Sequence, residues 1–480
     1  MNQASTDQGY DVVVIGAGPT GENVAGRAGR AGLRSVVVEA ELVGGECSYW
    51  ACMPSKALLR PPAAVAEARS VRGAREAVTG SLSVTGVLER RDEFTHGWND
   101  ERQVRWLEQH RVDLVRGHGR LAGERRVVVD QPGGGTVELP ARHAVAVATG
   151  TAALVPPVPG LREAKPWTSR QATSARAAPR SLVVLGGGVV GCEMATAWSS
   201  LGTQEVTLIQ RRTRLLPGNE PFAGEAVKSA LEGRGVRVLL GATATNVERD
   251  ARGQVSLELA GGETIVAEEL LVATGRKPRT DDIGLETVGL EPGAWLDVDD
   301  TMLVTEVDGG WLYAAGDINH RALLTHMGKY QARICGDVIA ARAAGRSVDP
   351  APWSPHAATA NNGCVPQVIF TDPEVGAVGL TSDRAASQGL RVRSVDYEIG
   401  EVTGASLFAD GYRGHARMVV DEDRGVIVGM TLVGMAVGEM IHAATIAVAG
   451  QVPLHRLWHA VPSYPTMSEI WLRLLEAYGL

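Results

Sequence analysis

Two cysteines separated by four residues, Cys47 and Cys52, are the residues of this 480-residue sequence best suited to carry out chemistry. They lie in the stretch GGECSYWACMPSK, residues 44–56. A thiol pair that opens and closes a disulfide takes up and releases two electrons. An isolated pair of cysteines is more often buried as small hydrophobic side chains. This pair follows a glycine-rich nucleotide motif closely in the sequence, and that setting predicts a redox-active disulfide.

The spacing of the pair also predicts a local distortion. In a straight α-helix, residues five apart are separated by about 7.5 Å of rise. That exceeds the usual Cα separation of a disulfide, about 4.4–6.8 Å. The helix must therefore be distorted near its first turn, where Gly44 and Gly45 help. Strained bridges are the more easily reduced ones, so we expect a labile disulfide.

The elements that position this stretch begin with a dinucleotide motif. The apolar run YDVVVI (residues 10–15) is typical of a strand buried in a parallel sheet, and GAGPTG follows it directly. In that motif Gly16 permits a tight turn, Gly18 lets a pyrophosphate approach the backbone, and Gly21 permits close helix–strand packing. A second strand ends at Glu39, 23 residues after Gly16, where an acid can accept hydrogen bonds from ribose hydroxyls.

The same plan occurs again later in the chain. LVVLGGGVVGCE supplies Gly186, Gly188 and Gly191 after a strand, and each half closes with an ATG turn, at residues 148–150 and 273–275. Residues 151–180 are rich in proline and alanine and are interpreted as a linker. A chain with two such folds is expected to bind two dinucleotides.

The composition excludes several classes of protein. A hydrophobic content of 44% and a charged content of 21% are typical of a globular chain, and the net charge of −8 argues against nucleic-acid binding. The apolar stretch 435–449 is too short to span a membrane. About ten residues precede the first strand, too few for a signal peptide, so a cytoplasmic location is expected. Five cysteines in so long a chain are no disulfide framework.

Taken in order, these motifs resemble the flavoprotein disulfide reductases, the family of dihydrolipoamide dehydrogenase, glutathione reductase and mercuric reductase. The resemblance covers nearly the whole chain and includes YAAGD (313–317), PQVIFTDPEVGAVGLT (366–381) and YPTMSE (464–469). It implies an α/β fold with two Rossmann-like domains, for FAD and NAD(P), and a C-terminal α+β dimerisation domain. The expected segments are 1–150 and 281–350 for the FAD and central domain, 151–280 for NAD(P), and 351–480 for dimerisation.

The resemblance also implies roles for individual residues. Cys52 would be the sulfur next to the flavin and Cys47 the sulfur that meets the acceptor, while Lys56 would pair with Glu193 near the flavin. Cys192, Cys335 and Cys364 are expected to be structural. The residues expected to hold FAD are Gly16, Gly18, Gly21, Glu39, Gly45, Lys56, Gly119, Thr149, Gly150, Asp317 and His326. Those expected to hold NAD(P) are Gly186, Gly188, Gly191, Glu193, Gln210, Arg211, Arg212 and Gly275.

The strand end at Gln210-Arg211-Arg212 bears on the choice of coenzyme. An enzyme that uses NADH usually has an acid here for the ribose diol. Guanidinium groups instead suit a 2′-phosphate, so we expect NADPH, with NADH as the alternative. Arg214 is a further candidate for the same role. The alternative is that these arginines simply form a solvated basic loop without a ligand.

The C-terminal motif departs from that of the disulfide-reducing relatives. They carry a histidine directly before the Pro-Thr pair, whereas this chain has Tyr464, followed by Glu469. By the resemblance these two residues would act across a homodimer interface, in an active site shared between subunits. Tyrosine, with a reference pKa of about 10, is a poor base at neutral pH. His459, five residues earlier, is a weaker candidate for that proton-transfer role.

Several acceptors therefore stay open: a small disulfide, a quinone or Hg(II). Mercuric reductases also carry tyrosine at this point, but they typically end in a vicinal cysteine pair, whereas this chain ends AYGL. Tyr49 and Trp50 add bulk beside the reactive sulfurs. The alternatives are the dihydrolipoamide dehydrogenase of a multienzyme complex and a redox-sensing flavoprotein without enzymatic activity. No metal site is expected.

Overall fold

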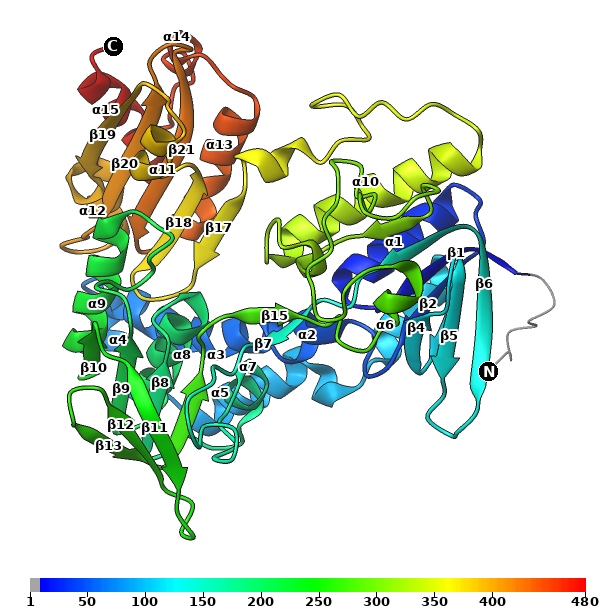
Figure 1. The fold of residues 1–480 in the computed structure, drawn as a ribbon. Helices are drawn as coiled ribbons and strands as arrows, with labels where there is room; N and C mark the ends of the chain where they lie inside the picture. Colours follow the sequence, from blue (N-terminus) through cyan, green and yellow to red (C-terminus); the bar gives the residue numbers. More distant parts are fainter. Residues whose placement is uncertain (1–8) are drawn as a thin grey trace. The chain divides into compact units, whose positions relative to one another are not determined.

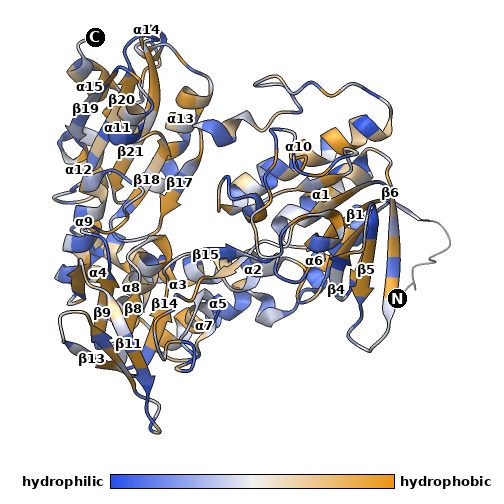
Figure 2. Cartoon of the chain, viewed as in Figure 1, coloured by the Kyte–Doolittle hydropathy of each residue, from blue (hydrophilic) through white to orange (hydrophobic). Residues whose placement is uncertain are grey.

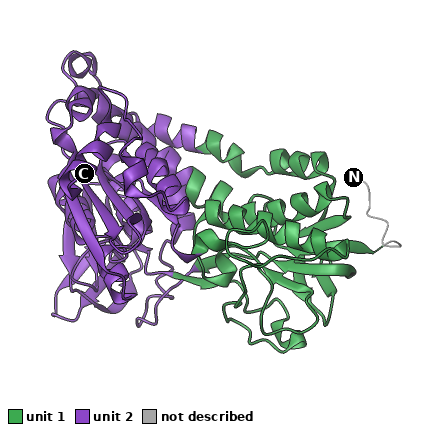
Figure 3. Cartoon of the chain, turned by 90° about the horizontal axis from the view of Figure 1, so that it is seen from above, with its two compact units in different colours: residues 1–53, 92–152, 276–361 green, residues 54–91, 153–275, 362–480 purple. Residues whose placement is uncertain are grey.

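The computed structural model describes residues 9–480. The chain forms two compact units, each assembled from three segments of the sequence (Figure 3). Unit 1 comprises Met1–Met53, Asp92–Ala152 and Arg276–Asn361, and unit 2 comprises Pro54–Arg91, Ala153–Gly275 and Asn362–Leu480.

Unit 1 is built on a sheet whose strands run in the order β3-β2-β1-β6-β5-β4, with β16 also paired to β6 (Figure 1). The strands β1, β2, β3, β6 and β16 pair in parallel, whereas β4 and β5 form an antiparallel extension. Valine-rich β1 has almost no exposed side-chain surface, as expected for a strand covered on both faces. The bounds are β1 (Tyr10–Ile15), β2 (Ser35–Glu39), β3 (Val112–Arg116), β4 (His118–Leu121), β5 (Arg126–Asp130), β6 (Thr136–Val147) and β16 (Leu312–Ala314).

Two long helices of unit 1, α1 (Pro19–Arg30) and α10 (Thr325–Ala343), lie side by side (Figure 1). Arg27 and Asp337 join them through two hydrogen bonds of 2.6 and 2.8 Å. Gly336 allows the close approach, since a Cβ there would lie 2.6 Å from the Cβ of Arg27. The remaining elements of the unit are α2 (Gly45–Tyr49), η1 (His96–Trp98), α6 (Glu101–Gln109), β15 (Arg276–Pro278), η2 (Leu285–Val288) and η3 (Asp317–Asn319).

Unit 2 contains a second parallel sheet, in the order β10-β9-β8-β14 (Figure 1). An antiparallel three-stranded sheet, β11-β12-β13, follows β10 in the chain. The strands are β8 (Ser181–Leu185), β9 (Glu205–Gln210), β10 (Arg237–Leu240), β11 (Ala244–Arg249), β12 (Val255–Leu259), β13 (Thr264–Ala267) and β14 (Glu269–Val272). The helices are α3 (Cys52–Arg69), α4 (Ala74–Ala77), α5 (Val84–Phe94), α7 (Ser169–Ser174), α8 (Val189–Ser200) and α9 (Pro221–Gly233). The first two residues of α3 and the last three of α5 belong to unit 1.

The last third of unit 2 is an antiparallel sheet in the order β17-β18-β21-β20-β19. Its central strand β21 is buried along its whole length, and the hydropathy colouring shows its apolar character (Figure 2). The strands are β17 (Pro366–Ile369), β18 (Glu374–Gly379), β19 (Val392–Glu398), β20 (His415–Asp421) and β21 (Val426–Gly434). The helices are α11 (Ser382–Ser387), α12 (Thr403–Phe408), α13 (Val437–Ala449), α14 (Leu454–Leu457) and α15 (Ile470–Tyr478).

The predicted fold class is confirmed: two Rossmann-type sheets and a C-terminal α+β part are present. The domain boundaries expected at residues 150, 280 and 350 stay predictions, whereas the compact units change at residues 152, 275 and 361. The linker expected at 151–180 contains a short strand, β7 (Thr151–Ala153), and helix α7. No helix among residues 9–480 is both long and apolar enough to cross a bilayer.

Candidate active site

The cysteine stretch of unit 1 is not one continuous helix. Gly44 and Gly45 have φ of +107° and +55°, values that glycine adopts easily, and α2 starts from them. This helix ends at Tyr49, and Trp50 leaves helical geometry with φ of −137°. A new helix, α3, then begins at Cys52. The break supplies the distortion that the spacing of the two cysteines predicts.

Both cysteines are half-buried. A hydrogen bond to Cys52, burial and the charge on Cys52 all raise the pKa of Cys47. The two side chains therefore interact directly, and this interaction favours the protonated form of Cys47. Cys52 Sγ also lies 3.2 Å from Oγ1 of Thr325, the first residue of α10.

The first glycine turn has the geometry that close packing demands. A Cβ at Gly21 would lie 1.9 Å from the carbonyl oxygen of Gly16, and Gly16 has φ of +98° with Ala148 O against it. A side chain fits at neither residue. A Cβ at Gly18 would meet nothing within 4 Å, so the space in front of its backbone is open. This open backbone at the start of α1 is what a pyrophosphate requires.

The cysteine stretch packs directly on this glycine turn. The Gly44 N–H donates to the Ala17 carbonyl at 2.7 Å. A Cβ at Gly45 would lie 3.0 Å from the Cα of Gly18. The backbone that carries Cys47 is thus held against the dinucleotide motif by contacts that only a glycine permits.

Two carboxylates expected to bind the flavin are held by neighbouring groups of unit 1. Glu39, at the end of β2, accepts the N–H groups of Ala17 and Glu41, each at 2.8 Å. Asp317 accepts the Thr151 hydroxyl at 2.8 Å, and burial raises the pKa of Asp317. Both side chains are therefore oriented by bonds of their own before any ligand is considered.

The other residues expected to hold the flavin have varied surroundings. Thr149 Oγ1 donates to the Arg279 carbonyl at 2.8 Å, and Gly150 has φ of +68° in the same turn. His326 is exposed on the first turn of α10. Gly119 lies on β4, where a Cβ would meet Val38 Cγ1 at 2.9 Å, so packing by itself explains this glycine.

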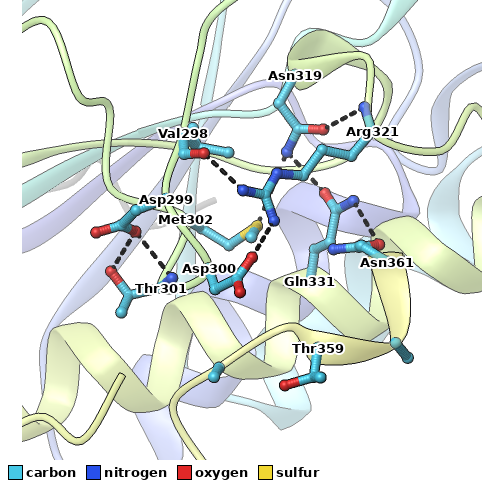
Figure 4. Close-up of polar contacts among 12 residues, drawn as sticks. Val298, Asp299, Asp300, Thr301, Met302, Asn319, Arg321, Gln331, Thr359 and Asn361 are labelled. Atoms are coloured by element: carbon cyan, nitrogen blue, oxygen red, sulfur yellow. Dashed lines mark hydrogen bonds and ion pairs between the residues drawn. The ribbon is translucent and has the colours of Figure 1, made fainter. Parts of the chain in front are cut away.

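Sequence reasoning missed residues that are far away in the chain but contact the predicted site: Thr325, beside Cys52, and those around Gly316, which precedes Asp317. Gln331 Oε1 accepts the Gly316 N–H at 2.7 Å and the side-chain amide of Asn319 at 2.9 Å, in a buried network shown in Figure 4. Thr20 fits between Gly316 and Gly328, where a Cβ would lie 2.8 and 2.4 Å from its hydroxyl oxygen. No local pattern identifies these contacts, because the partners come from separate segments of the chain.

Two acidic residues beside the predicted motifs were also missed. Glu46, in α2, accepts Arg279 Nη2 at 2.9 Å. Glu22, one residue after the glycine turn, has a buried Oε1 without a partner among the described residues, and burial raises its pKa to about 8. The signal that could have identified them is their sequence position: Glu46 lies within the cysteine stretch, and Glu22 directly follows the first glycine motif.

The second glycine turn, in unit 2, repeats the geometry of the first. A Cβ at Gly191 would lie 1.8 Å from Gly186 O, and one at Gly186 would lie 2.4 Å from Ala273 O. A Cβ at Gly188 would again meet nothing within 4 Å. Gly275, in the second ATG turn, has φ of +146°. The duplicated sequence plan is therefore a duplicated structure.

The predicted pair of Lys56 and Glu193 is present in unit 2. Lys56 Nζ donates to Glu193 Oε2 at 2.8 Å, and Phe370 N donates to Glu193 Oε1 at 3.0 Å. Glu193 is buried, and the ammonium also lies 5.0 Å from the centre of the Phe370 ring. Because both carboxylate oxygens of Glu193 accept a hydrogen bond and one partner is cationic, the free-energy cost of burying its negative charge is offset.

The expected coenzyme-selecting residues end β9. Gln210 is buried and its Oε1 accepts the Arg212 N–H at 3.4 Å, whereas Arg211 and Arg212 are exposed. Arg214 donates to the Pro217 carbonyl at 3.1 Å. The Gln210 side chain packs near the second glycine turn, where a Cβ at Gly187 would lie 3.0 Å from Gln210 Cβ, and the coenzyme role of Arg211 and Arg212 stays a prediction.

The two C-terminal residues differ sharply in burial. Tyr464 is 73% exposed, and Glu469 is 5% exposed. Glu469 Oε2 is buried without a partner among the described residues. His459 is exposed. The roles expected for Tyr464 and Glu469 stay predictions.

Comparisons with known proteins identify the class. Residues 10–341 match the family described as pyridine nucleotide-disulphide oxidoreductase, and residues 365–474 match its dimerisation domain. The chain belongs to the pyridine nucleotide-disulphide oxidoreductases, FAD-dependent enzymes with a pyridine nucleotide substrate, as the sequence motifs predicted.

Individual relatives cover almost all of the chain. "Dihydrolipoyl dehydrogenase 3" of Pseudomonas aeruginosa is 33% identical over 477 residues, covering 96% of both chains. "Mercuric reductase" of Staphylococcus aureus is 29% identical and covers 96% of this chain and 81% of that protein. The fold is similar to that of the HOCl-induced flavoprotein disulfide reductase RclA from Escherichia coli in its Cu(II) complex, with a TM-score of 0.82, 22% identity, and 98% and 99% of the two chains covered. It is equally similar to LpdA from Mycobacterium tuberculosis, with a TM-score of 0.82, 24% identity, and 98% and 100% covered.

Two glycines of the first turn permit a test in which a single methyl group is added to each. Gly21→Ala should destabilise the protein by about 1–3 kcal/mol, because the methyl group overlaps the Gly16 carbonyl. Gly18→Ala meets no protein atom and should leave the unfolding midpoint in urea unchanged, yet weaken FAD binding. Urea unfolding and FAD titration of the stripped protein measure the two effects. Wild-type FAD affinity in Gly18→Ala would show that no ligand approaches this backbone.

Proposed function

We propose that this protein transfers electrons from NADPH, through FAD and the Cys47–Cys52 pair, to a small disulfide acceptor. The observation that carries the proposal is the contact of the two thiols on a backbone that packs against the first glycine turn. The family assignment supports an enzyme of this kind.

The residues of unit 1 fit a flavin dinucleotide. The open backbone at Gly18 suits the pyrophosphate, Glu39 suits the ribose, and Asp317 is poised at the start of η3 for a further hydroxyl contact. When bound, FAD supplies two-electron chemistry between a nicotinamide and a disulfide. Lys56, with its charge balanced by Glu193, is proposed to lie beside the flavin ring system.

The thiols perform the exchange. The Cys47 thiolate attacks one sulfur of the acceptor disulfide, which forms a mixed disulfide and releases the first product thiol. Cys52 then attacks the Cys47 sulfur, re-forms the Cys47–Cys52 bridge and releases the second thiol. The dithiol is thereby oxidised to the Cys47–Cys52 disulfide, and the two electrons that it loses reduce the acceptor disulfide to two thiols.

The raised pKa of Cys47 makes proton handling the weak point of this cycle. A protonated thiol is not nucleophilic, so a base must take its proton before attack. The disulfide-reducing members of the family that this sequence resembles carry a histidine at this point, whereas this chain has Tyr464. In a homodimer, which the dimerisation domain supports, we propose that Tyr464 and Glu469 of one subunit serve the thiols of the other.

Hg(II) is the second candidate acceptor. A pair of thiols within bonding reach of each other is a good ligand set for a soft metal ion. One relative is named mercuric reductase, which supports the same idea. No group of three or more metal-binding side chains occurs in residues 9–480, so any metal would be a substrate held by the two thiols.

A thiolate against oxidised flavin gives a long-wavelength absorption band, which tests the proposed relay. Anaerobic NADPH titration of wild type should produce the band. Cys52→Ser should abolish it, whereas Cys47→Ser should retain it, because Cys52 is the proposed flavin-proximal sulfur. If no band forms in wild type, or if Cys52→Ser still shows one, the proposed relay is wrong.

The coenzyme proposal is tested by the ratio of kcat/KM for NADPH to that for NADH. Replacing Arg211 and Arg212 with Ala should lower this ratio by about tenfold or more, since charge-assisted hydrogen bonds to a phosphate are worth about 1.5–3 kcal/mol. Arg252→Ala, which removes an exposed arginine from a different loop of unit 2, is the matched control. A wild-type preference for NADH would contradict the proposal.

Tyr464→His tests whether the missing base limits ordinary disulfides. The variant should raise turnover of lipoamide and glutathione disulfide and give the rate a new dependence on pH near neutrality. Tyr464→Phe, which cannot titrate, should not. Equal turnover in both variants would show that the shape of the acceptor pocket, and not the base, sets the rate.

A further inference from the structure

Unit 1 contains a cavity of about 370 Å³ with a strongly basic lining. It is formed by the middle of β6, the start of β16, the loop before it and the last turn of α10. The residues that line it are Arg125, Arg142, His143, Ala144, Gly309, Gly310, Tyr313, Ile339, Arg342 and Ala343. Three guanidinium groups and an imidazole therefore face a space large enough for a small ligand.

The bonds of two of these arginines fix their positions. Arg342 Nη1 donates to the Tyr313 hydroxyl at 2.7 Å and to the Gly310 carbonyl at 3.3 Å. Arg142 is held by Asp11 and the Gly9 carbonyl, each at 2.8 Å. The side chains that project the positive charge are thus oriented in advance, which lowers the entropy cost of binding.

Arg125 supplies an unused donor. Its Nη1 lies 3.2 Å from Glu124, but its Nε is buried and has no partner among the described residues. A guanidinium presents its donors in one plane, and a tetrahedral oxyanion accepts two of them at once. No acidic residue is among those that line the cavity, and the acids that pair with Arg125 and Arg142, Glu124 and Asp11, lie outside the lining.

The cavity is remote from the proposed redox centre. Arg142 precedes Ala148, which packs on the first glycine turn, by six residues of extended strand, or about 20 Å. The other connection is α10, which begins at Thr325 beside Cys52 and ends at Ala343 in the cavity, and its 19 residues span roughly 28 Å. A ligand here lies away from both the first glycine turn and Cys52.

We propose that this cavity is a binding site for a phosphate-type dianion, either free phosphate or the phosphate group of a small ester. Arg125 and Arg342 contribute the anion-binding guanidinium groups, and Tyr313 orients Arg342. Arg142, which pairs with Asp11, and His143 complete the polar lining. The proposal does not depend on the proposed acceptor.

The test is calorimetric titration of the FAD-loaded protein with inorganic phosphate at low ionic strength. Because Arg211 and Arg212 are expected to bind a phosphate elsewhere, the titration uses a background in which both are Ala. Saturable binding with one site per chain is expected in this background. Its absence would overturn the proposal.

Variants then assign the site to the cavity. Arg125→Met and Arg342→Met should each weaken phosphate binding about tenfold, as loss of a charge-assisted hydrogen bond predicts. Arg120→Met is the matched control: Arg120 is in the same unit and also has a buried Nε without a described partner, but does not line the cavity. Equal weakening by Arg120→Met, or none by the two cavity variants, would refute the assignment.

Two further measurements complete the design. Thermal melting identifies any variant that fails to fold, and Arg125→Lys then replaces Arg125→Met, since it keeps the charge but loses the planar donor pair. Glycerol 3-phosphate is titrated beside inorganic phosphate. Tighter binding of the ester assigns the site to a small phosphate ester, and tighter or equal binding of inorganic phosphate assigns it to the free ion.

Discussion

The proposed active site depends on two close approaches of backbone to backbone that only glycine permits. At Gly21 the helix after the first strand comes so near that a methyl group would overlap the Gly16 carbonyl. At Gly45 the cysteine stretch also comes near the turn, since a Cβ there would lie 3.0 Å from the Gly18 Cα. Together these approaches hold the start of α2 on the dinucleotide turn. Gly44 and Gly45, both with positive φ, start α2, which is five residues long and ends at Tyr49 before α3 begins at Cys52.

The same turn occurs twice, and the differences after it explain why the two copies suit different ligands. After the first copy, the next strand ends in Glu39, whose two oxygens are held by backbone N–H groups. After the second, the corresponding strand ends in the neutral Gln210, followed by two exposed arginines. An anionic strand end suits ribose hydroxyls, whereas a cationic loop suits an extra phosphate. Under the proposed function, the residues at the end of the second strand therefore decide which dinucleotide each copy prefers, while the glycine turn stays the same.

Local sequence carries the motifs but not their distant partners. The glycine turns, the break between the cysteines and the pair of Lys56 and Glu193 follow from spacing or from the family resemblance, and the structure contains them. Thr325 could not be found in this way, because it reaches Cys52 from 273 residues away. Gly119 stays a predicted flavin residue, and its contact with Val38 gives a second reason for a small residue at this position. Patterns of type and spacing report local conformation, and they carry no information on which distant segments pack together.

The raised pKa of Cys47 bears on which class of electron acceptor the proposed site suits best. The contact with Cys52 and burial raise the pKa of Cys47, whereas the Lys329 ammonium lowers it. Under the proposed function, the exposed Tyr464 stands where a histidine would serve, and a tyrosine exchanges protons poorly with a leaving thiol at neutral pH. The rate of exchange rises as the pKa of the leaving thiol falls, because such a thiol departs as a thiolate without protonation. Disulfides with acidic thiols, and soft metal ions that displace the Cys47 proton on binding, therefore suit this arrangement better than lipoamide, whose alkyl thiols are weak acids.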